Sequence, residues 1–172
     1  MDFVNLLSIG IIGFVGSQVF GTRQTNPQAQ VIINNNKVKG VIKFEQTSQS
    51  NVTIEVSLEG LGPNSSHGFH IHAIPIKPSD SCDLAGPHFD LTNSPHGGPH
   101  DSPKQRHIGD LGNILADSNG QVKTKFSDYL IKLSGPESII NKTLVIHESQ
   151  DDLKTIESSG KRIACGLIVP IV

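Results

Sequence analysis

The sequence predicts one all-β domain, a sandwich or barrel built from short strands. Three observations favour this fold class. Only 17% of the 172 residues are charged, and 17 Gly and 10 Pro make the chain rich in turns rather than in long surface helices. Apolar and polar residues alternate in short segments along much of the chain. Breaks rich in Asn, Ser, Gly and Pro separate those segments, as the loops of an all-β protein would.

Eight segments have the composition of strands. Residues 28–34, 37–45 and 52–58 alternate apolar with polar side chains, which is the pattern of a strand with one buried face. The other five candidates are residues 67–73, 110–117, 122–128, 143–147 and 162–169. Residues 75–104, dense in Pro, Gly and Ser, and residues 148–161 interrupt the pattern. Long loops in a compact domain are usually functional or disordered, and no helix of ordinary length is expected.

The first 30 residues differ in composition from the rest of the chain. Residues 6–21 are uncharged and mostly apolar, and their centre has the length of a signal-peptide hydrophobic region but is too short to span a membrane. We therefore expect residues 1–21 to be a cleaved signal peptide, with an uncleaved anchor or a cytosolic extension as alternatives. This favours a secreted or secretory-pathway location over a cytoplasmic one. Residues 22–30 are interpreted as a linker, and residues 31–172 as the folded domain.

The net charge and the histidine content limit the classes of function that the protein can have. The formal net charge is −2, from 14 basic and 16 acidic residues, which argues against a protein that binds nucleic acid by neutralising phosphates. The unusual feature is the presence of 8 His beside one Tyr, one Met and no Trp. Imidazole is the commonest metal ligand and a frequent acid–base group. The positions of the histidines are therefore the best guide to function.

His70 and His72 stand two residues apart in a predicted strand, so both imidazoles project from one face and can converge on an ion. A polar surface face would give the same pattern. Other candidate ligands lie in or after the first long loop and at a strand end, namely His88, His96, His107, Asp110 and His147. These seven residues exceed the four ligands of a tetrahedral site, so either two ions or a shared ligand is implied.

The chain resembles the copper/zinc superoxide dismutase family in seven short segments. They are GFHIH (68–72), GPHF (86–89), HGGP (96–99), RHIGDLGN (106–113), TLVIHE (143–148), DDL (151–153) and KRIACG (161–166). Their order and most of their spacings agree with the family over residues 30–169, and such a set is far more specific than any single motif. The resemblance implies a flattened eight-stranded Greek-key β-barrel, an immunoglobulin-like sandwich, with long metal-binding and electrostatic loops and a binuclear site.

The resemblance also assigns the metal ligands. The implied copper ligands are His70, His72, His88 and His147, and the implied zinc ligands are His88, His96, His107 and Asp110, so that His88 bridges the two ions. Coordination chemistry agrees, because four nitrogens suit copper and three nitrogens with one carboxylate suit zinc. Asp151 is implied to hydrogen-bond one histidine of each metal and so to orient both rings. His67 is interpreted as a hydrogen-bonded core residue beneath the copper ligands.

Three further residues match family positions. Cys82 and Cys165 match an intrasubunit disulfide, with two free buried thiols as the alternative. A bridge between them would close a loop of roughly 80 residues, for which the chain-entropy model gives about 4 to 5 kcal/mol of stabilisation. Arg162 matches an active-site arginine beside copper, where a guanidinium keeps its charge and offers a forked set of donors to a small anion. A surface arginine at the start of a strand is the alternative.

The implied activity is the disproportionation of superoxide to oxygen and hydrogen peroxide, an antioxidant defence, by copper that cycles between Cu(II) and Cu(I). The resemblance implies that Arg162 attracts the anion and that His88 is released from copper, protonated, and later gives up that proton. One copper and one zinc ion per subunit are implied. The alternative is a non-catalytic homologue that binds copper or zinc or acts as a decoy. That role usually follows the loss of a copper ligand or of the arginine, and neither is missing here.

The resemblance further implies partners and marks two departures. A homodimer is expected through the first strand, the segment around Ile139 and Ile140, and the C-terminal strand. A dedicated copper chaperone is not expected to be required, because members that depend on one carry prolines on both sides of the arginine, where this chain has Lys161 and Ile163. The loop that ends at His107 is longer than in the common animal form and adds His100 as a competing candidate for zinc. The loop before Arg162 is shorter.

Overall fold

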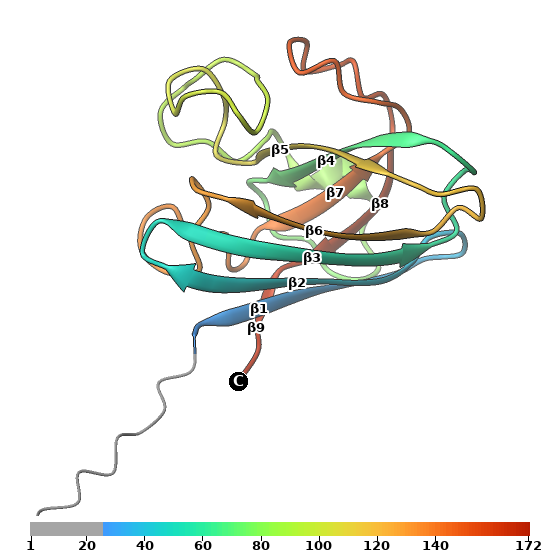
Figure 1. Cartoon of the computed structure of the whole chain (residues 1–172), viewed down its shortest axis with the longest axis horizontal. Helices are drawn as coiled ribbons and strands as arrows, with labels where there is room; N and C mark the ends of the chain where they lie inside the picture. Colours follow the sequence, from blue (N-terminus) through green and yellow to red (C-terminus); the bar gives the residue numbers. More distant parts are fainter. Residues whose placement is uncertain (1–25) are drawn as a thin grey trace, which may run out of the picture.

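The computed structural model describes residues 26–172, which form two antiparallel sheets packed face to face (Figure 1). One sheet has five strands in the order β6-β3-β2-β1-β9, and the other has four in the order β5-β4-β7-β8. The strands are β1 (Gln28–Asn34), β2 (Lys39–Ser48), β3 (Asn51–Glu59), β4 (Ser66–His72), β5 (Asp110–Leu115), β6 (Val122–Asp128), β7 (Thr143–His147), β8 (Arg162–Leu167) and β9 (Val169–Pro170). The predicted all-β sandwich is confirmed. No helix within the described residues is long and apolar enough to cross a membrane.

The alternating side chains of the five-stranded sheet build the core. In β1 the buried residues Ala29, Val31 and Ile33 alternate with exposed or partly exposed neighbours. β3 repeats the pattern with four buried aliphatic residues from Val52 to Leu58. Because successive side chains of a strand point to opposite faces, this period places every second residue against the other sheet. Burial of these aliphatic side chains is the main stabilising contribution of the sandwich.

β4 and β7 are buried on both faces. In β7 all five residues are buried, and in β4 all but the first. Phe69 and Ile71 of β4 belong to the core between the sheets. The alternate residues His70 and His72 face the other way and are also buried, at 0% and 1% exposure. Figure 1 shows the two long loops on that outer side of the four-stranded sheet, so the loops create a second, polar interior.

Several strand boundaries differ from the sequence-based expectation. β2 begins at Lys39 rather than residue 37, because the Asn35 side-chain oxygen accepts hydrogen bonds from the backbone amides of Lys37 and Val38 and holds them in a turn. β5 ends at Leu115 rather than residue 117, because Asp117 accepts hydrogen bonds from the amides of the following turn. Side-chain caps of this kind compete with strand pairing.

The two ends of the domain also differ from expectation. β1 has the bounds that were predicted for this strand, Gln28–Asn34, and Gln28 pairs with Glu45. Residues 28–30, which were also assigned to the linker, therefore belong to the sheet. The expected strand 162–169 divides at Ile168, which is buried in the core. Its last part becomes β9, which pairs with β1 instead of β7 and adds a ninth strand to the predicted eight. The expected hydrophobic segment 1–21 lies outside the described residues.

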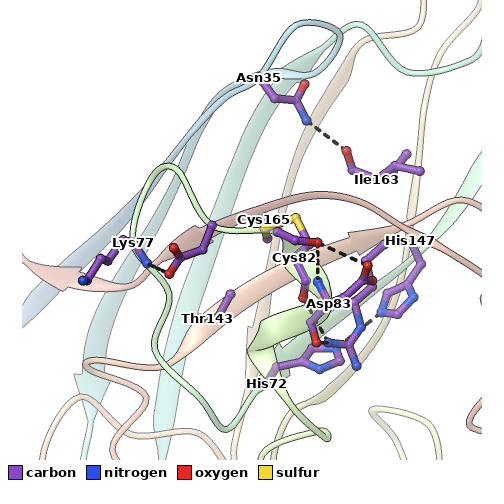
Figure 2. Close-up of a disulfide and its surroundings, with 12 residues drawn as sticks. Asn35, His72, Lys77, Cys82, Asp83, Thr143, His147, Ile163 and Cys165 are labelled. Atoms are coloured by element: carbon purple, nitrogen blue, oxygen red, sulfur yellow. Dashed lines mark hydrogen bonds between the residues drawn. A yellow bond between two sulfur atoms is a disulfide. The ribbon is translucent and has the colours of Figure 1, made fainter.

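A short 3-10 helix, η1 (Cys82–Ala85), was not predicted within the first long loop. It carries one half of a disulfide between Cys82 and Cys165 of β8, whose Cα atoms are 5.7 Å apart (Figure 2). The expected disulfide is therefore confirmed, and the alternative of two free thiols is wrong. Because the cysteines are 83 residues apart, the bridge restricts a large loop of the unfolded chain, and it ties the first long loop to the sheet in the folded one.

Candidate metal centre

The first group of possible ligands stands on the outer face of the four-stranded sheet. His70 and His72 come from β4, and His147 comes from the end of the neighbouring β7. His88 reaches them from the loop after η1, where it forms an isolated β-bridge with His72. Each of the four buried residues offers one ligand atom, and these atoms all lie within 4.8 Å of one another. The proximity expected from the spacing of His70 and His72 is therefore present.

A second group adjoins the first and shares His88 with it. It consists of His88, His96, His107 and Asp110, again with ligand atoms within 4.8 Å of one another. Asp110 lies at the centre, since its Oδ1 is 2.7 Å from His88 Nδ1 and 3.1 Å from His107 Nδ1. Its Oδ2 is 3.1 Å from His96 Nδ1. The structure thus brings all seven expected ligands into two groups that share one imidazole.

Hydrogen bonds to backbone carbonyl oxygens leave one ring nitrogen of His72 and one of His147 free for a metal ion. His72 Nδ1 lies 2.8 Å from the Gly86 carbonyl oxygen, and His147 Nδ1 lies 3.2 Å from that of Gly160. A carbonyl oxygen only accepts hydrogen bonds, so Nδ1 carries the hydrogen and Nε2 keeps a lone pair. The two Nε2 atoms face each other at 3.4 Å. Two rings of the first group are therefore fixed in the tautomer that a metal site needs.

Two buried ring nitrogens have no hydrogen-bond partner, which tests whether metal ions fit. They are Nδ1 of His70 and Nδ1 of His96, one from each group. His96 Nδ1 lies 3.1 Å from Asp110 Oδ2, but the two atoms form no hydrogen bond. Leaving such a nitrogen unpaired in the interior costs about 1 to 3 kcal/mol, so native proteins rarely do so without a ligand. The Nε2 atoms of the same two rings bind Asp151, at 2.7 Å from His70 and 3.0 Å from His96. Both groups therefore fit a metal ion.

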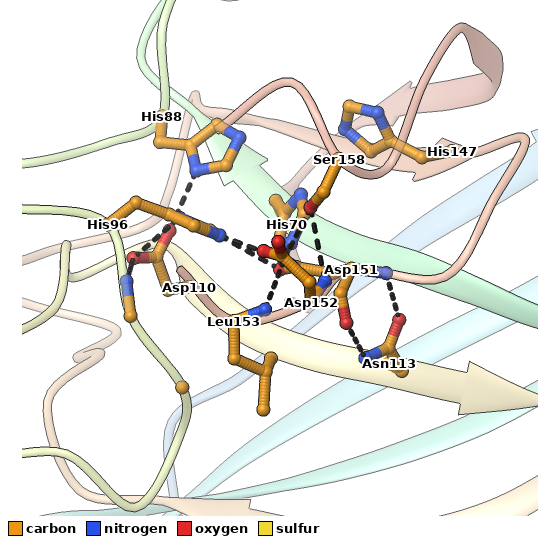
Figure 3. Close-up of polar contacts among 12 residues, drawn as sticks. His70, His88, His96, Asp110, Asn113, His147, Asp151, Asp152, Leu153 and Ser158 are labelled. Carbon is orange, nitrogen blue, oxygen red and sulfur yellow. Dashed lines mark hydrogen bonds and ion pairs between the residues drawn. The ribbon is translucent and has the colours of Figure 1, made fainter. Parts of the chain in front are cut away.

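Asp151 links the two groups, as Figure 3 shows. It is 1% exposed and lies on the loop after β7. Its backbone amide donates to Asn113 Oδ1 at 2.8 Å, and its carbonyl oxygen accepts from Asn113 Nδ2 at 3.0 Å. Sequence reasoning assigned no role to Asn113, although it ends the RHIGDLGN segment. The reciprocal pair fastens the loop to β5 and holds the Asp151 carboxylate against both rings.

Burial and charge give the two groups different protonation behaviour. Burial lowers the pKa of His72 to about 2 and those of His88 and His147 to about 4, with further lowering from neighbouring histidines. At neutral pH these rings are neutral and their lone pairs are available. Burial opposes the protonation of His96, but its contacts with Asp110 and Asp151 outweigh burial and raise its pKa to about 10. A cation is therefore favoured beside these carboxylates.

Asp110 and Asp151 remain ionised for a related reason. Burial favours their neutral forms, but hydrogen bonds from the surrounding imidazoles hold the pKa of each well below its ordinary value. The first group thus offers four imidazoles, and the second offers three imidazoles with one anionic carboxylate. These donor sets suit two different transition-metal ions.

The structure also shows the surroundings of the two remaining histidines, His67 and His100. His67 is buried, and its ring nitrogens lie 2.7 Å from the His147 carbonyl oxygen and 2.7 Å from the Ser65 hydroxyl. The prediction of a hydrogen-bonded core residue is confirmed. His100 is exposed and belongs to none of the ligand groups found among residues 26–172. Competition by His100 for the second group is therefore not supported.

Arg162 opens β8 and lines a cavity of about 960 Å³ together with His72, His88 and His147. Its Nη1 donates to the Cys82 carbonyl oxygen at 3.0 Å, and its Nη2 donates to that of Gly86 at 2.7 Å. Gly86 also receives the His72 ring, and Cys82 is fixed by the disulfide. The guanidinium is thus held beside the first ligand group by the segment that also orients one of its ligands.

A two-sheet β fold with two adjoining ligand groups that share an imidazole defines a binuclear metalloprotein. The family model for copper/zinc superoxide dismutase matches residues 38–168, which include every residue of both groups. The chain belongs to the copper/zinc superoxide dismutase family. Copper and zinc are the two metals for which this family is named.

Individual relatives agree with the family assignment. A Cu-Zn superoxide dismutase of Saccharomyces cerevisiae is 45% identical over 140 residues, which cover 76% of this chain and 89% of the relative. One from Xenopus laevis is 44% identical over 80% of this chain and 93% of its own length. The crystal structure of the clock protein EA4 has a TM-score of 0.78 at 33% identity and covers 85% of this chain and 96% of that chain.

Metal binding is predicted to depend on His147 and not on His100. His147→Ala removes a ring from the first group and should lower bound copper to well below one ion per chain. His100→Ala changes an exposed ring outside both groups and should leave copper and zinc content unchanged. Elemental analysis of both purified variants after loading measures this. Loss of metal in His100→Ala, with full copper in His147→Ala, would contradict the grouping described above.

Proposed function

We propose that the protein is an antioxidant enzyme that disproportionates superoxide to oxygen and hydrogen peroxide. The observation that carries the proposal is the pairing of two complete ligand groups with a fixed guanidinium at the head of an open cavity. The family assignment and the names of the relatives support it. No observation favours the non-catalytic alternative, since no ligand and no arginine is missing. A superoxide assay of metal-loaded protein, with copper and zinc measured, separates the two.

We assign copper to His70, His72, His88 and His147, and zinc to His88, His96, His107 and Asp110. The support is chemical: four nitrogen donors suit copper, and three nitrogens with an ionised carboxylate suit zinc. Copper would supply the one-electron oxidation and reduction of superoxide. Because His88 belongs to both groups, its ring is the natural link between them. Asp151 keeps one ring of each group in the orientation that leaves Nδ1 free.

The residues of the chain have two tasks in this reaction. Two superoxide anions and two protons give one oxygen and one hydrogen peroxide, so each anion must be attracted and the peroxide must receive two protons. Arg162 attracts the anion, because its charge persists at all relevant pH values and its position is fixed by backbone carbonyls. His88 supplies one proton, and water supplies the other.

Activity is predicted to fall but not to vanish when Arg162 is neutralised. Copper binding does not require this side chain, but the local attraction for the anion does. Arg162→Ile should lower the second-order rate constant several-fold to roughly a hundredfold, Arg162→Lys should retain more activity, and Arg162→Glu should be worst. Raising ionic strength toward 0.15 M, where the Debye length is about 8 Å, should slow the unmodified enzyme. A rate constant that depends neither on ionic strength nor on the charge of the side chain at position 162 would refute this role.

We also propose a homodimer whose contact is formed by β1, the segment before β7 and the C-terminal strands. Ile32 of β1 is 63% exposed, and the partly buried Ile140 and Leu167 lie in the other two segments. Ile139, which was expected to contribute, is fully buried in the core and is not available to a partner. A second copy related by a two-fold axis would cover the same segments on both chains.

The dimer proposal predicts a species of twice the 18.5 kDa chain mass in sedimentation at micromolar concentration. Ile32→Lys places a charge in the proposed contact and should shift the population to monomer. Leu115→Lys is a matched control, since Leu115 is 69% exposed on β5, the edge strand of the other sheet. A single 18.5 kDa species of the unmodified protein would rule the dimer out.

We further propose that maturation needs no dedicated copper chaperone. The support is the absence of proline at Lys161 and Ile163 on either side of Arg162. Proline removes a backbone N–H and restricts φ, which would hinder the approach of β8 to the first long loop before the disulfide closes. Expression in chaperone-deficient cells supplied with copper should give active protein with the Cys82–Cys165 bond. An inactive product without the disulfide would contradict this.

For location, we propose entry into the secretory pathway, with a cytoplasmic protein as the alternative. The support is confined to the apolar composition of residues 1–21. The N-terminal residue of the mature protein decides the matter: a start near residue 22 indicates a cleaved signal, and a start at Met1 argues against one.

A further inference from the structure

The strand that carries Arg162 has a β-bulge at its start. In the pairing of β8 with β7, Arg162 stands opposite His147, and Ala164 stands opposite Ile146. Ile163, which lies between them, therefore has no partner on β7. A bulge of this kind bends the strand and re-aims a side chain, and bulges are frequent beside active sites. β8 is an edge strand, so no other strand of its sheet holds its second side.

The bulge decides where the arginine side chain points. Successive side chains of a strand project to opposite faces, so a shift of the pairing by one residue turns each side chain to the other face. If the bulge were removed and Ile163 paired with His147, Arg162 would point away from the cavity that it now lines together with His147. The position of the guanidinium therefore depends on the contacts that keep the bulge in place.

Asn35, in the turn between β1 and β2, contacts the bulge from the other sheet. Its Nδ2 donates a hydrogen bond to the Ile163 carbonyl oxygen at 2.9 Å (Figure 2). On the other side of Arg162, the Glu148 amide donates to the Lys161 carbonyl oxygen at 2.7 Å. The backbone of β8 is thus held by a hydrogen bond before Arg162 and by another after it.

The Asn35 side chain is itself held in one orientation. Its Oδ1 accepts hydrogen bonds from the backbone amides of Lys37 and Val38, at 2.9 and 2.6 Å. The Asn35 amide donates to the Val38 carbonyl oxygen at 3.1 Å, and Val38 is fully buried in the core. Because backbone amides only donate and a carbonyl oxygen only accepts, these partners define which end of the side chain carries the nitrogen. The turn therefore presents a fixed N–H donor to β8.

We propose that Asn35 is a positioning residue for Arg162, whose hydrogen bond stabilises the bulge at Ile163 and keeps the guanidinium directed into the cavity. Asn35 belongs to neither ligand group and does not line the cavity. The carbonyl oxygens of Cys82 and Gly86 hold the far end of the arginine side chain, whereas Asn35 acts on the backbone from which it starts. The inference rests on the proposed function for the superoxide reaction, but it applies to any small anion that binds at Arg162.

The substitution Asn35→Asp tests this hydrogen bond. An aspartate keeps an oxygen for the amides of Lys37 and Val38, so the turn is retained, but it offers no N–H to Ile163. Azide is a small anion, and its binding to the copper-loaded protein can be followed by absorbance. Asn35→Asp should weaken azide binding about 2- to 10-fold, the range expected for the loss of one hydrogen bond. The rate constant for superoxide should fall by a similar factor, with metal content unchanged.

Asn36→Asp is the matched control. Asn36 is exposed in the same turn, and its side chain forms no hydrogen bond with residues 26–172. The control introduces the same negative charge without removing a donor to β8. At 0.15 M salt, where exposed charges are screened, its effect on azide binding should stay below about twofold.

A double variant separates positioning of the arginine from a general structural effect. In an Arg162→Ile background the guanidinium is already absent, so the addition of Asn35→Asp should weaken azide binding no further. Additive losses, no effect of Asn35→Asp, or equal effects of Asn35→Asp and Asn36→Asp would overturn the inference. Loss of copper from Asn35→Asp would also overturn it, because the bond would then support the ligand group rather than the arginine.

The azide titration also keeps the inference separate from the proposed function. If the unmodified, fully loaded protein lacks superoxide activity, the proposed function fails. The comparison of azide binding among the same variants then still decides whether Asn35 positions Arg162.

Discussion

The Asp151 carboxylate is the contact on which the rest of the centre depends. It binds one ring from each ligand group and also accepts hydrogen bonds from the Leu153 amide and the Ser158 hydroxyl. One buried anion therefore orients both groups and shapes the loop that covers them. Such a carboxylate is stable in the interior only because every oxygen has a donor. If its partners move, the loop and the rings lose their arrangement together.

The part of the cavity around Arg162 is held by a different set of contacts. The disulfide places Cys82 against β8, and the guanidinium of Arg162 then reaches the carbonyl oxygens of Cys82 and Gly86. Gly86 in turn orients His72. The same covalent bond thus restricts the unfolded chain and positions a ligand and an anion-binding side chain in the folded one. Stability and function share these contacts, so they cannot be altered independently.

The buried ligands and the cavity lining carry different kinds of charge. Inside, burial keeps the rings of His72, His88 and His147 neutral, whereas Asp110 and Asp151 supply the negative charge that compensates a cation. The cavity lining adds two acidic and two basic side chains, whose formal charges cancel.

Local pattern in the sequence determined the class of fold, the bounds of strands such as Gln28–Asn34 and Val122–Asp128, and the set of candidate ligands. It could do so because side-chain alternation and motif identity are properties of neighbouring residues. Only the tertiary structure decided that the chain after Ile168 forms a strand that pairs with β1. The same holds for the hydrogen bond between Asn113 and Asp151, and for the presence of Lys161 rather than Lys154 in the cavity lining. These outcomes depend on contacts between segments far apart in the chain, which no local period encodes.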